Sequence, residues 1–233
     1  MRARPRSRLV ALCAGGALAV AVGALGPPGA WAAHRHCRVP RGSRAWAQSA
    51  KAIVYADGPF ANPDTHNTRV VACWRPSGRR TPVGYDYRFD EDDPTSRFAI
   101  VRLAGRWLAV DRVRVNLFAA TGSSPIPQIA VLDLRRGKTR YCVAPPVGDF
   151  LSALAVDPDG SAAWISNSGA AGAAPPAAVQ AYDRDGLRTL YWGLRGRLST
   201  LSLAARRASW RDGQTPGSAS VLGPPRPGSC PSP

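Results

Sequence analysis

The sequence predicts an all-β protein assembled from a repeated unit of short strands. Residues 132–142 (LDLRRGKTRYC) and 182–192 (YDRDGLRTLYW) share one pattern at a spacing of 50 positions. A second strand pair, residues 154–166 (LAVDPDGSAAWIS), precedes the later copy, with Pro, Asp and Gly at its centre. Short runs of apolar and β-branched residues on either side of such turn residues are typical of β-hairpins. Two hairpins per unit of about 50 residues predict four antiparallel strands in each unit.

The repeated aspartates are best explained as residues that begin turns. Asp133 and Asp183 each stand where a strand ends, and each is followed within a few residues by Gly137 or Gly186. An aspartate carboxylate in this place accepts hydrogen bonds from backbone amides of the turn, and glycine completes the turn. We therefore interpret both aspartates as turn formers and not as catalysts.

About four units fit the chain. We expect a repeat domain over 49–222, between an N-terminal segment at 33–48 and a Pro-rich tail at 223–233. The units begin at residues 49–58, 101–110, 154–166 and 201–210. About four units of four strands predict a β-propeller-like array, as either a closed small propeller or an open partial propeller. A β-sandwich of two packed sheets is the alternative.

These repeats resemble the blades of known bacterial propellers. LAVDPDGSAAWISN followed by VQAYDRDGLRTLYW is similar to blades of the secreted TolB-like, YVTN and quinoprotein-type repeat proteins. The resemblance covers residues 45–222 as architecture, is clearest over 98–192, and implies an exported propeller of a high-GC bacterium. The tryptophan-docking motif of the quinoproteins is absent from the sequence. The resemblance therefore implies no quinone, and we expect no cofactor.

The first 32 residues have the order of a secretory signal peptide. Four arginines precede an apolar run at 9–25, then Pro27 and Pro28, and then Ala30-Trp31-Ala32. This order predicts cleavage after Ala32. We expect a secreted or cell-envelope protein that has no membrane span after cleavage. The alternative is a protein anchored in the membrane by an uncleaved N-terminal segment.

Four cysteines remain after the predicted cleavage, and an even number in an exported chain predicts disulfides. They are Cys37, Cys73, Cys142 and Cys230. Four cysteines allow three pairings; we favour Cys37–Cys230, which would tie the two ends of the chain together, with Cys73–Cys142. Metal binding by these thiols is disfavoured because the sequence has no C-x-x-C pair.

The chain is strongly basic, with a formal charge of +16, of which the four arginines of the leader supply four. Arginine pairs occur at 79–80, 135–136 and 206–207, far apart in the sequence. One explanation is the codon bias of a high-GC genome. The other is a basic surface for anionic wall polymer, lipid headgroups or nucleic acid. The scatter of the arginines along the chain favours the first explanation, because interaction patches usually show denser runs.

Residues that could bind a metal are few. The acidic run that contains Asp90, Asp92 and Asp93 offers hard oxygens for Ca²⁺ but lacks the spacing of a calcium loop. His34 and His36, at the predicted mature N-terminus, are weak candidates for copper or nickel. We expect that none of these five residues forms a metal site.

Catalytic motifs are also absent from the sequence. It contains no G-x-S-x-G elbow, no P-loop and no H-E-x-x-H pair. His66 stands in a polar loop and is interpreted as a solvated histidine, with binding as its alternative role. Tyr191 and Trp192 end a strand and are candidates for stacking on a sugar ring, although burial in a core is the simpler explanation.

We therefore expect an exported, non-catalytic binding or scaffold module of the cell envelope or extracellular space. The candidate partners are an anionic cell-wall polymer, a carbohydrate or another exported protein, with no specific nucleic acid. The alternative is a propeller-type hydrolase or lyase that uses aspartates on its loop face. That alternative predicts a pocket in which at least two titratable groups have shifted pKa values.

Overall fold

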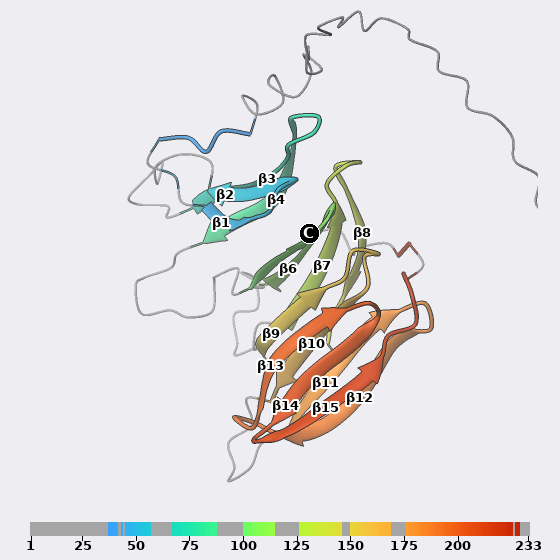
Figure 1. Ribbon diagram of the computed structural model, residues 1–233. Coiled ribbons are helices and arrows are strands. Elements are labelled where there is room, and N and C mark those ends of the chain that lie inside the picture. Colours follow the sequence, from blue (N-terminus) through green and yellow to red (C-terminus); the bar gives the residue numbers. More distant parts are fainter. Residues whose placement is uncertain are drawn as a thin grey trace, which may run out of the picture.

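Every regular element in the described part of the chain is a β-strand. The computed structural model describes residues 37–41, 43, 45–56, 67–87, 100–114, 126–145, 150–168, 176–225 and 227–228. Their strands form antiparallel sheets that follow one another along the chain (Figure 1). Over the same residues, no helix has the length and apolar character needed to cross a membrane.

Each sheet is a meander of consecutive strands. The first sheet contains β1 (Ala45–Gln48), β2 (Ala52–Ala56), β3 (Asn67–Trp74) and β4 (Arg79–Tyr87). The second contains β5 (Val101–Ala104), β6 (Trp107–Arg114), β7 (Ile126–Asp133) and β8 (Lys138–Val143). The third contains β9 (Phe150–Val156), β10 (Ala162–Asn167), β11 (Pro176–Asp183) and β12 (Gly186–Leu194). The fourth contains β13 (Leu198–Ala204), β14 (Arg207–Asp212) and β15 (Thr215–Ser220).

This architecture confirms the all-β, propeller-like array and not the alternative of two packed sheets. Three sheets have four strands, as expected, whereas the fourth has three within the described residues. The first strands of successive sheets lie next to one another, β1 by β5, β5 by β9 and β9 by β13. They therefore occupy the place of the innermost strands of propeller blades.

Apolar layers hold successive sheets together. Leu108 and Leu132 of the second sheet pack against the first sheet, and Trp107 of the second packs with Trp164 of the third. Trp210 of the fourth sheet packs on the third. The second and third sheets are covered on both faces, so the sequences of their strands are nearly continuous apolar runs. Burial of these side chains supplies most of the stabilisation of the fold.

The array is open within the described residues, because no apolar layer joins its first and last sheets. Figure 1 shows these two sheets at opposite ends of the stack. The outer face of the first sheet is covered by the segment around Cys37 and Val39, which packs on Tyr55 and Val71. The outward residues of the fourth sheet are mostly serine and arginine. A polar outer face is typical of a terminal repeat, so this sheet ends the stack.

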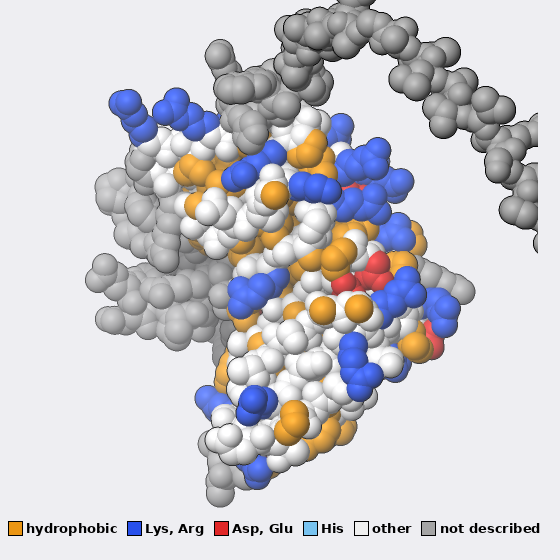
Figure 2. All heavy atoms as spheres, in the orientation of Figure 1, with side chains coloured by type: hydrophobic (Ala, Val, Ile, Leu, Met, Phe, Trp, Pro, Cys, Tyr) orange, Lys and Arg blue, Asp and Glu red, His pale blue; other side chains and the backbone are white. Residues whose placement is uncertain are grey.

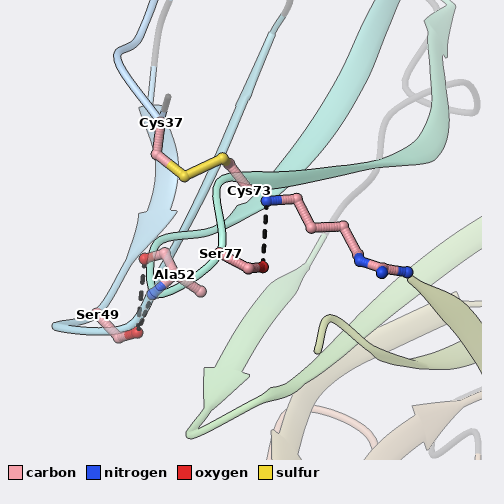
Figure 3. Close-up of a disulfide and its surroundings, with 6 residues drawn as sticks. Cys37, Ser49, Ala52, Cys73 and Ser77 are labelled. Carbon is pink, nitrogen blue, oxygen red and sulfur yellow. Dashed lines mark hydrogen bonds between the residues drawn. A yellow bond between two sulfur atoms is a disulfide. The ribbon is translucent and has the colours of Figure 1, made fainter. Parts of the chain in front are cut away.

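The cysteine pairing expected from the sequence is wrong. Cys37 is bonded to Cys73, with an S–S distance of 1.99 Å and a Cα–Cα distance of 5.5 Å (Figure 3). Cys73 lies on the outer face of the first sheet, whereas Cys142 packs between the first and second sheets. The first sheet thus separates Cys73 from Cys142, and a short bond between them is geometrically excluded. The Cys37–Cys73 disulfide indicates an extracytoplasmic protein.

The turn Asp157–Gly160 between β9 and β10 connects three sheets. The carbonyl of Pro158 in this turn accepts a hydrogen bond at 3.0 Å from Nε1 of Trp107, which lies in the second sheet. The Gly160 carbonyl accepts one from the Tyr141 hydroxyl at 3.0 Å. On the side of the fourth sheet, Oδ2 of Asp157 accepts a hydrogen bond at 2.7 Å from the backbone N–H of Arg206, which lies in the turn between β13 and β14.

The residues after β15 cross the same end of the stack. The Gly223 carbonyl accepts a hydrogen bond from Ser161 of the third sheet at 2.7 Å. The Pro225 carbonyl accepts one from Arg140 of the second sheet at 3.3 Å, and the Gly228 N–H donates to the Arg140 carbonyl at 3.2 Å. This segment is therefore a strap from the fourth sheet to the second.

Replacement of Gly160 by alanine should destabilise the protein by about 3 kcal/mol or more. Gly160 has a φ of +94°, and a Cβ on it would lie 2.9 Å from the Trp107 ring. The expected loss combines backbone strain with displacement of that ring, and urea unfolding measures it. Gly186 is the matched control, because it has the same φ of +94° and no atom within 4 Å of a built Cβ. Gly186→Ala should cost only the backbone strain, about 1 kcal/mol, and equal losses in the two variants would contradict the proposed role of the turn.

Peptide mapping without reduction should recover Cys37 linked to Cys73 and Cys142 linked to Cys230. Cys142 is disulfide-bonded, and the strap lies beside it, because the Gly228 N–H donates to the carbonyl of Arg140 at 3.2 Å. Cys230 is two residues further along the chain. Recovery of Cys142 linked to Cys13 instead would exclude this pairing and would show that the N-terminal segment is retained.

Candidate functional site

The turns after the first and third strands of the first three sheets, and after the first strand of the fourth sheet, lie at one end of the stack. In a meander, the turns after the first and third strands fall on the same edge of the sheet. The turn 134–137 lies beside the first sheet, where Nη1 of Arg79 donates to the Arg136 carbonyl at 2.8 Å. Trp107 and Arg206 meet the turn Asp157–Gly160 from the second and fourth sheets. The turns thus form one continuous surface.

This surface gathers arginine pairs that are far apart in the sequence. Each pair lies in or beside a hairpin turn: residues 79–80 at the start of β4, 135–136 between β7 and β8, and 206–207 at the end of the turn before β14 and on its first residue. We call the surface the turn face. Its cationic residues are Lys51, Arg75, Arg79, Arg80, Arg106, Arg135, Arg136, Lys138, Arg184, Arg206 and Arg207. In Figure 2, Lys and Arg side chains crowd the upper right edge of the molecule, near the turns of the first two sheets.

The aspartates of the turn face bind groups within the protein. Oδ1 of Asp133 accepts the backbone N–H groups of Arg135 at 3.1 Å and Arg136 at 3.3 Å. Its Oδ2 lies 3.8 Å from Nε of Arg106. Asp159 pairs with Arg206 at 3.1 Å. The expectation that Asp133 forms a turn is confirmed, and its charge is largely neutralised in place.

Asp183 is held in the same way. It accepts the N–H of Asp185 at 3.1 Å and that of Leu222 at 2.9 Å, and it forms a two-pronged ion pair with Arg188. Burial raises the pKa of Asp183, but the hydrogen bonds from Arg188, Leu222 and Asp185 outweigh burial and bring the pKa below its ordinary value. This aspartate joins the third sheet to the strap and is also a turn former, as expected.

Several cations of the turn face have no acidic partner. Within the described residues, Arg75, Arg135 and Lys138 form no ion pair. The guanidinium of Arg79 donates to the Arg136 carbonyl, and its backbone N–H donates to Oγ of Ser77, so it has no acidic partner there either. The turn face therefore has an uncompensated positive charge, which attracts and holds anions. The sequence alone favoured codon bias over a basic surface, because the arginine pairs are scattered along it and only the fold brings each of them to a hairpin turn.

The two aromatic candidates lie at the other end of β12. Tyr191 donates its hydroxyl to Oδ2 of Asp212 at 2.8 Å, and its ring lies 5.6 Å from that of Trp210. Tyr191 is 37% exposed and Trp192 is 55% exposed, so the simpler explanation, burial in a core, is wrong for both. His34, His36, His66, Asp90, Asp92 and Asp93 lie outside the described residues.

One buried carboxyl group differs from the turn aspartates. Asp111 on β6 is 1% exposed, and Oδ1 has no hydrogen-bond partner. Asp111 alternates along β6 with Trp107 and Ala109, so its side chain faces the third sheet. On that sheet, Oε1 of Gln180 accepts a hydrogen bond from Nε1 of Trp164 at 2.9 Å. Burial raises the pKa of Asp111 from 3.8 to about 7. Among the described residues, no second carboxyl group has a raised pKa. The same residues contain no group of three His, Cys, Asp or Glu side chains that could hold a metal ion.

The chain has no recognisable relative by sequence and a distant similarity to solved structures. No family model matches the sequence, and no curated protein matches it. Among solved structures, TolB from Acinetobacter baumannii is similar, with 15% sequence identity and a TM-score of 0.34. The match covers 76% of this chain and 42% of that TolB chain, so this protein spans less than half of its length. The sheets themselves define the class, an open β-propeller-like array with a cationic turn face.

Replacement of Asp111 by asparagine should flatten the pH dependence of stability. An acid whose pKa is raised by folding favours the folded state fully below its unfolded pKa of 3.8 and loses that contribution as the pH rises towards about 7. The loss is on the order of 4 kcal/mol. Urea unfolding at pH 5 and pH 8 should show wild-type stability falling with pH by more than that of Asp111→Asn. Parallel pH profiles would show that Asp111 is ionised in the folded protein.

Proposed function

We propose that the protein is an exported, non-catalytic binding module of the cell envelope whose turn face holds an anionic polymer. The observation that supports this proposal is the gathering of the arginine pairs on the turn face, where the nearby aspartates are already bound. A row of cations along one end of an elongated stack is suited to a repeating polyanion, because each further phosphate or carboxylate meets another cation.

The cellular location in this proposal comes from the leader and the disulfide together. Charged, apolar and small residues follow one another over 1–32 in the order of a signal peptide, and Cys37–Cys73 needs an oxidising compartment. The cell envelope and the extracellular space are both consistent with these features.

Other expected partners have less support. Carbohydrate binding through exposed Trp192 and protein binding through the apolar end of β12 each depend on few exposed side chains. The alternative of a hydrolase or lyase needs two carboxylates in one pocket. The aspartates of the described hairpin turns are instead bound to backbone amides and arginines.

The test is binding of inorganic polyphosphate and poly-γ-glutamate to the mature protein across a salt series. Reversal of Arg75, Arg135 and Lys138 to glutamate should weaken both interactions by about tenfold or more at low salt and reduce the salt dependence. These three side chains have no ion pair within the described residues, so folding should be preserved, which circular dichroism checks.

Reversal of Arg69, Arg102 and Arg195 is the matched control. They lie on parts of the strands and loops away from the hairpin turns, and the change in net charge is the same. The proposal is wrong if wild type binds neither polymer, or if the control triple weakens binding as much as the turn-face triple. In the second case the net charge of the whole protein, and not the turn face, would determine binding.

A further inference from the structure

The outer face of the fourth sheet has a second cationic surface. On β14, Ala208 and Trp210 point inwards and are buried against the third sheet. Arg207, Ser209 and Arg211 alternate with them and point outwards. This face is the end of the stack, and it lies in front of the third sheet in Figure 1.

The strand register surrounds these arginines with hydroxyl groups. Ser209 is paired with Ser202 of β13 and with Ser218 of β15, so three serines form a row across the sheet. Ser199 stands beside Arg211, and Ser220 stands beside Arg207. Within the described residues, no acidic side chain alternates into these outward positions of β14 and its partners.

The face is hollowed at this place. A depression of about 470 Å³ is bordered by Thr200, Arg207, Ser209, Arg211 and Ser218. A β-bulge interrupts β13 between Ser199 and Ser202, and Thr200 within it has a φ of 51°. Bulges redirect side chains at sheet edges and at binding sites. A threonine with a positive φ is strained. The hollow is therefore formed by this bulge.

The two arginines of the depression differ in their contacts. Nε and Nη2 of Arg207 both bind Oγ of Ser218, at 3.1 and 2.6 Å, which holds this guanidinium in place. Arg211 is exposed and has no polar partner within the described part of the chain. The two residues are separated by four positions on one strand, or about 13 Å. One cation is thus prearranged and the other is free to bind an anion.

We propose that this depression binds an acidic glycan strand, with its anionic groups on Arg207 and Arg211 and its hydroxyl groups on the serine row. Arginine forms paired hydrogen bonds with a carboxylate or a phosphate. Serine hydroxyls both donate and accept, so they match the hydroxyl groups of a sugar. A simple polyanion would use the arginines alone and would make no use of the hydroxyl groups of the serine row.

The inference goes beyond the proposed function and uses a different face. The turn face attracts polyanions by charge, whereas the depression selects anionic chains that also carry hydroxyl groups. Arg207 lies where the two surfaces meet, and Arg211 belongs to the outer face alone. Substitution of Arg211 therefore tests the depression without changing the turn face.

The experiment is calorimetric titration of the mature protein with four probes. Hexagalacturonate carries carboxylates and hydroxyls, and a glycerol phosphate hexamer carries phosphates with fewer hydroxyls. Maltohexaose is the neutral control, and inorganic polyphosphate is the control without hydroxyls. We expect hexagalacturonate to bind and maltohexaose not to bind, and binding of the glycerol phosphate hexamer would show that phosphate serves as well as carboxylate.

Arg211→Gln should weaken hexagalacturonate binding by about tenfold or more, and the double change Ser209→Ala with Ser218→Ala should weaken it as well. Arg195→Gln is the matched control and should leave it unchanged. Reversal of Arg75, Arg135 and Lys138 should reduce polyphosphate binding more than hexagalacturonate binding, because only hexagalacturonate also uses the depression. The inference is overturned if hexagalacturonate fails to bind wild type, or if the serine changes have no effect. Retained polyphosphate binding in that case would leave the turn face as the functional surface.

Discussion

The stack of sheets depends on the hydrogen bonds made by the turn Asp157–Gly160. Apolar burial draws successive sheets together but has no direction, so it does not by itself fix how one sheet is placed against the next. The turn supplies that direction: Trp107 and Tyr141 donate to its carbonyls from one side, and Arg206 donates to Asp157 from the other. Gly160 also packs against the Trp107 ring. Together these contacts fix how three successive sheets are placed against one another.

That arrangement explains why the turn face is cationic. The chain has 15 acidic and 31 basic residues, so carboxylates are scarce, and the described turns use theirs internally. Asp133, Asp157 and Asp183 each accept backbone N–H groups. The arginine pairs lie in or beside hairpin turns at the same end of the stack, because turn positions are solvent-exposed and tolerate charged side chains. The acids are bound to the backbone while the arginines extend into solvent, and a net positive surface results.

The sequence was informative where the structure is determined locally. Repeated hairpins, strand alternation and the turn aspartates follow from a few neighbouring residues, and the structure confirms them. The disulfide was not predictable, because Cys37 and Cys73 meet only after the N-terminal segment folds over the outer face of the first sheet. The turn face was missed for a related reason. Arginine pairs 56 or more positions apart become neighbours only when each pair falls in a hairpin turn and the turns share one edge.

The two ends of the open array are completed in different ways. The outer face of the first sheet is apolar, and a disulfide-linked segment of the same chain covers it, so Tyr55 is fully buried. The outer face of the fourth sheet presents serines and arginines, which need no covering because they remain hydrated. A closed ring would have buried Arg207 and Arg211 against another sheet without acidic partners, at a large desolvation cost. The residues of the last sheet therefore disfavour closure, and its outer face stays available to a ligand.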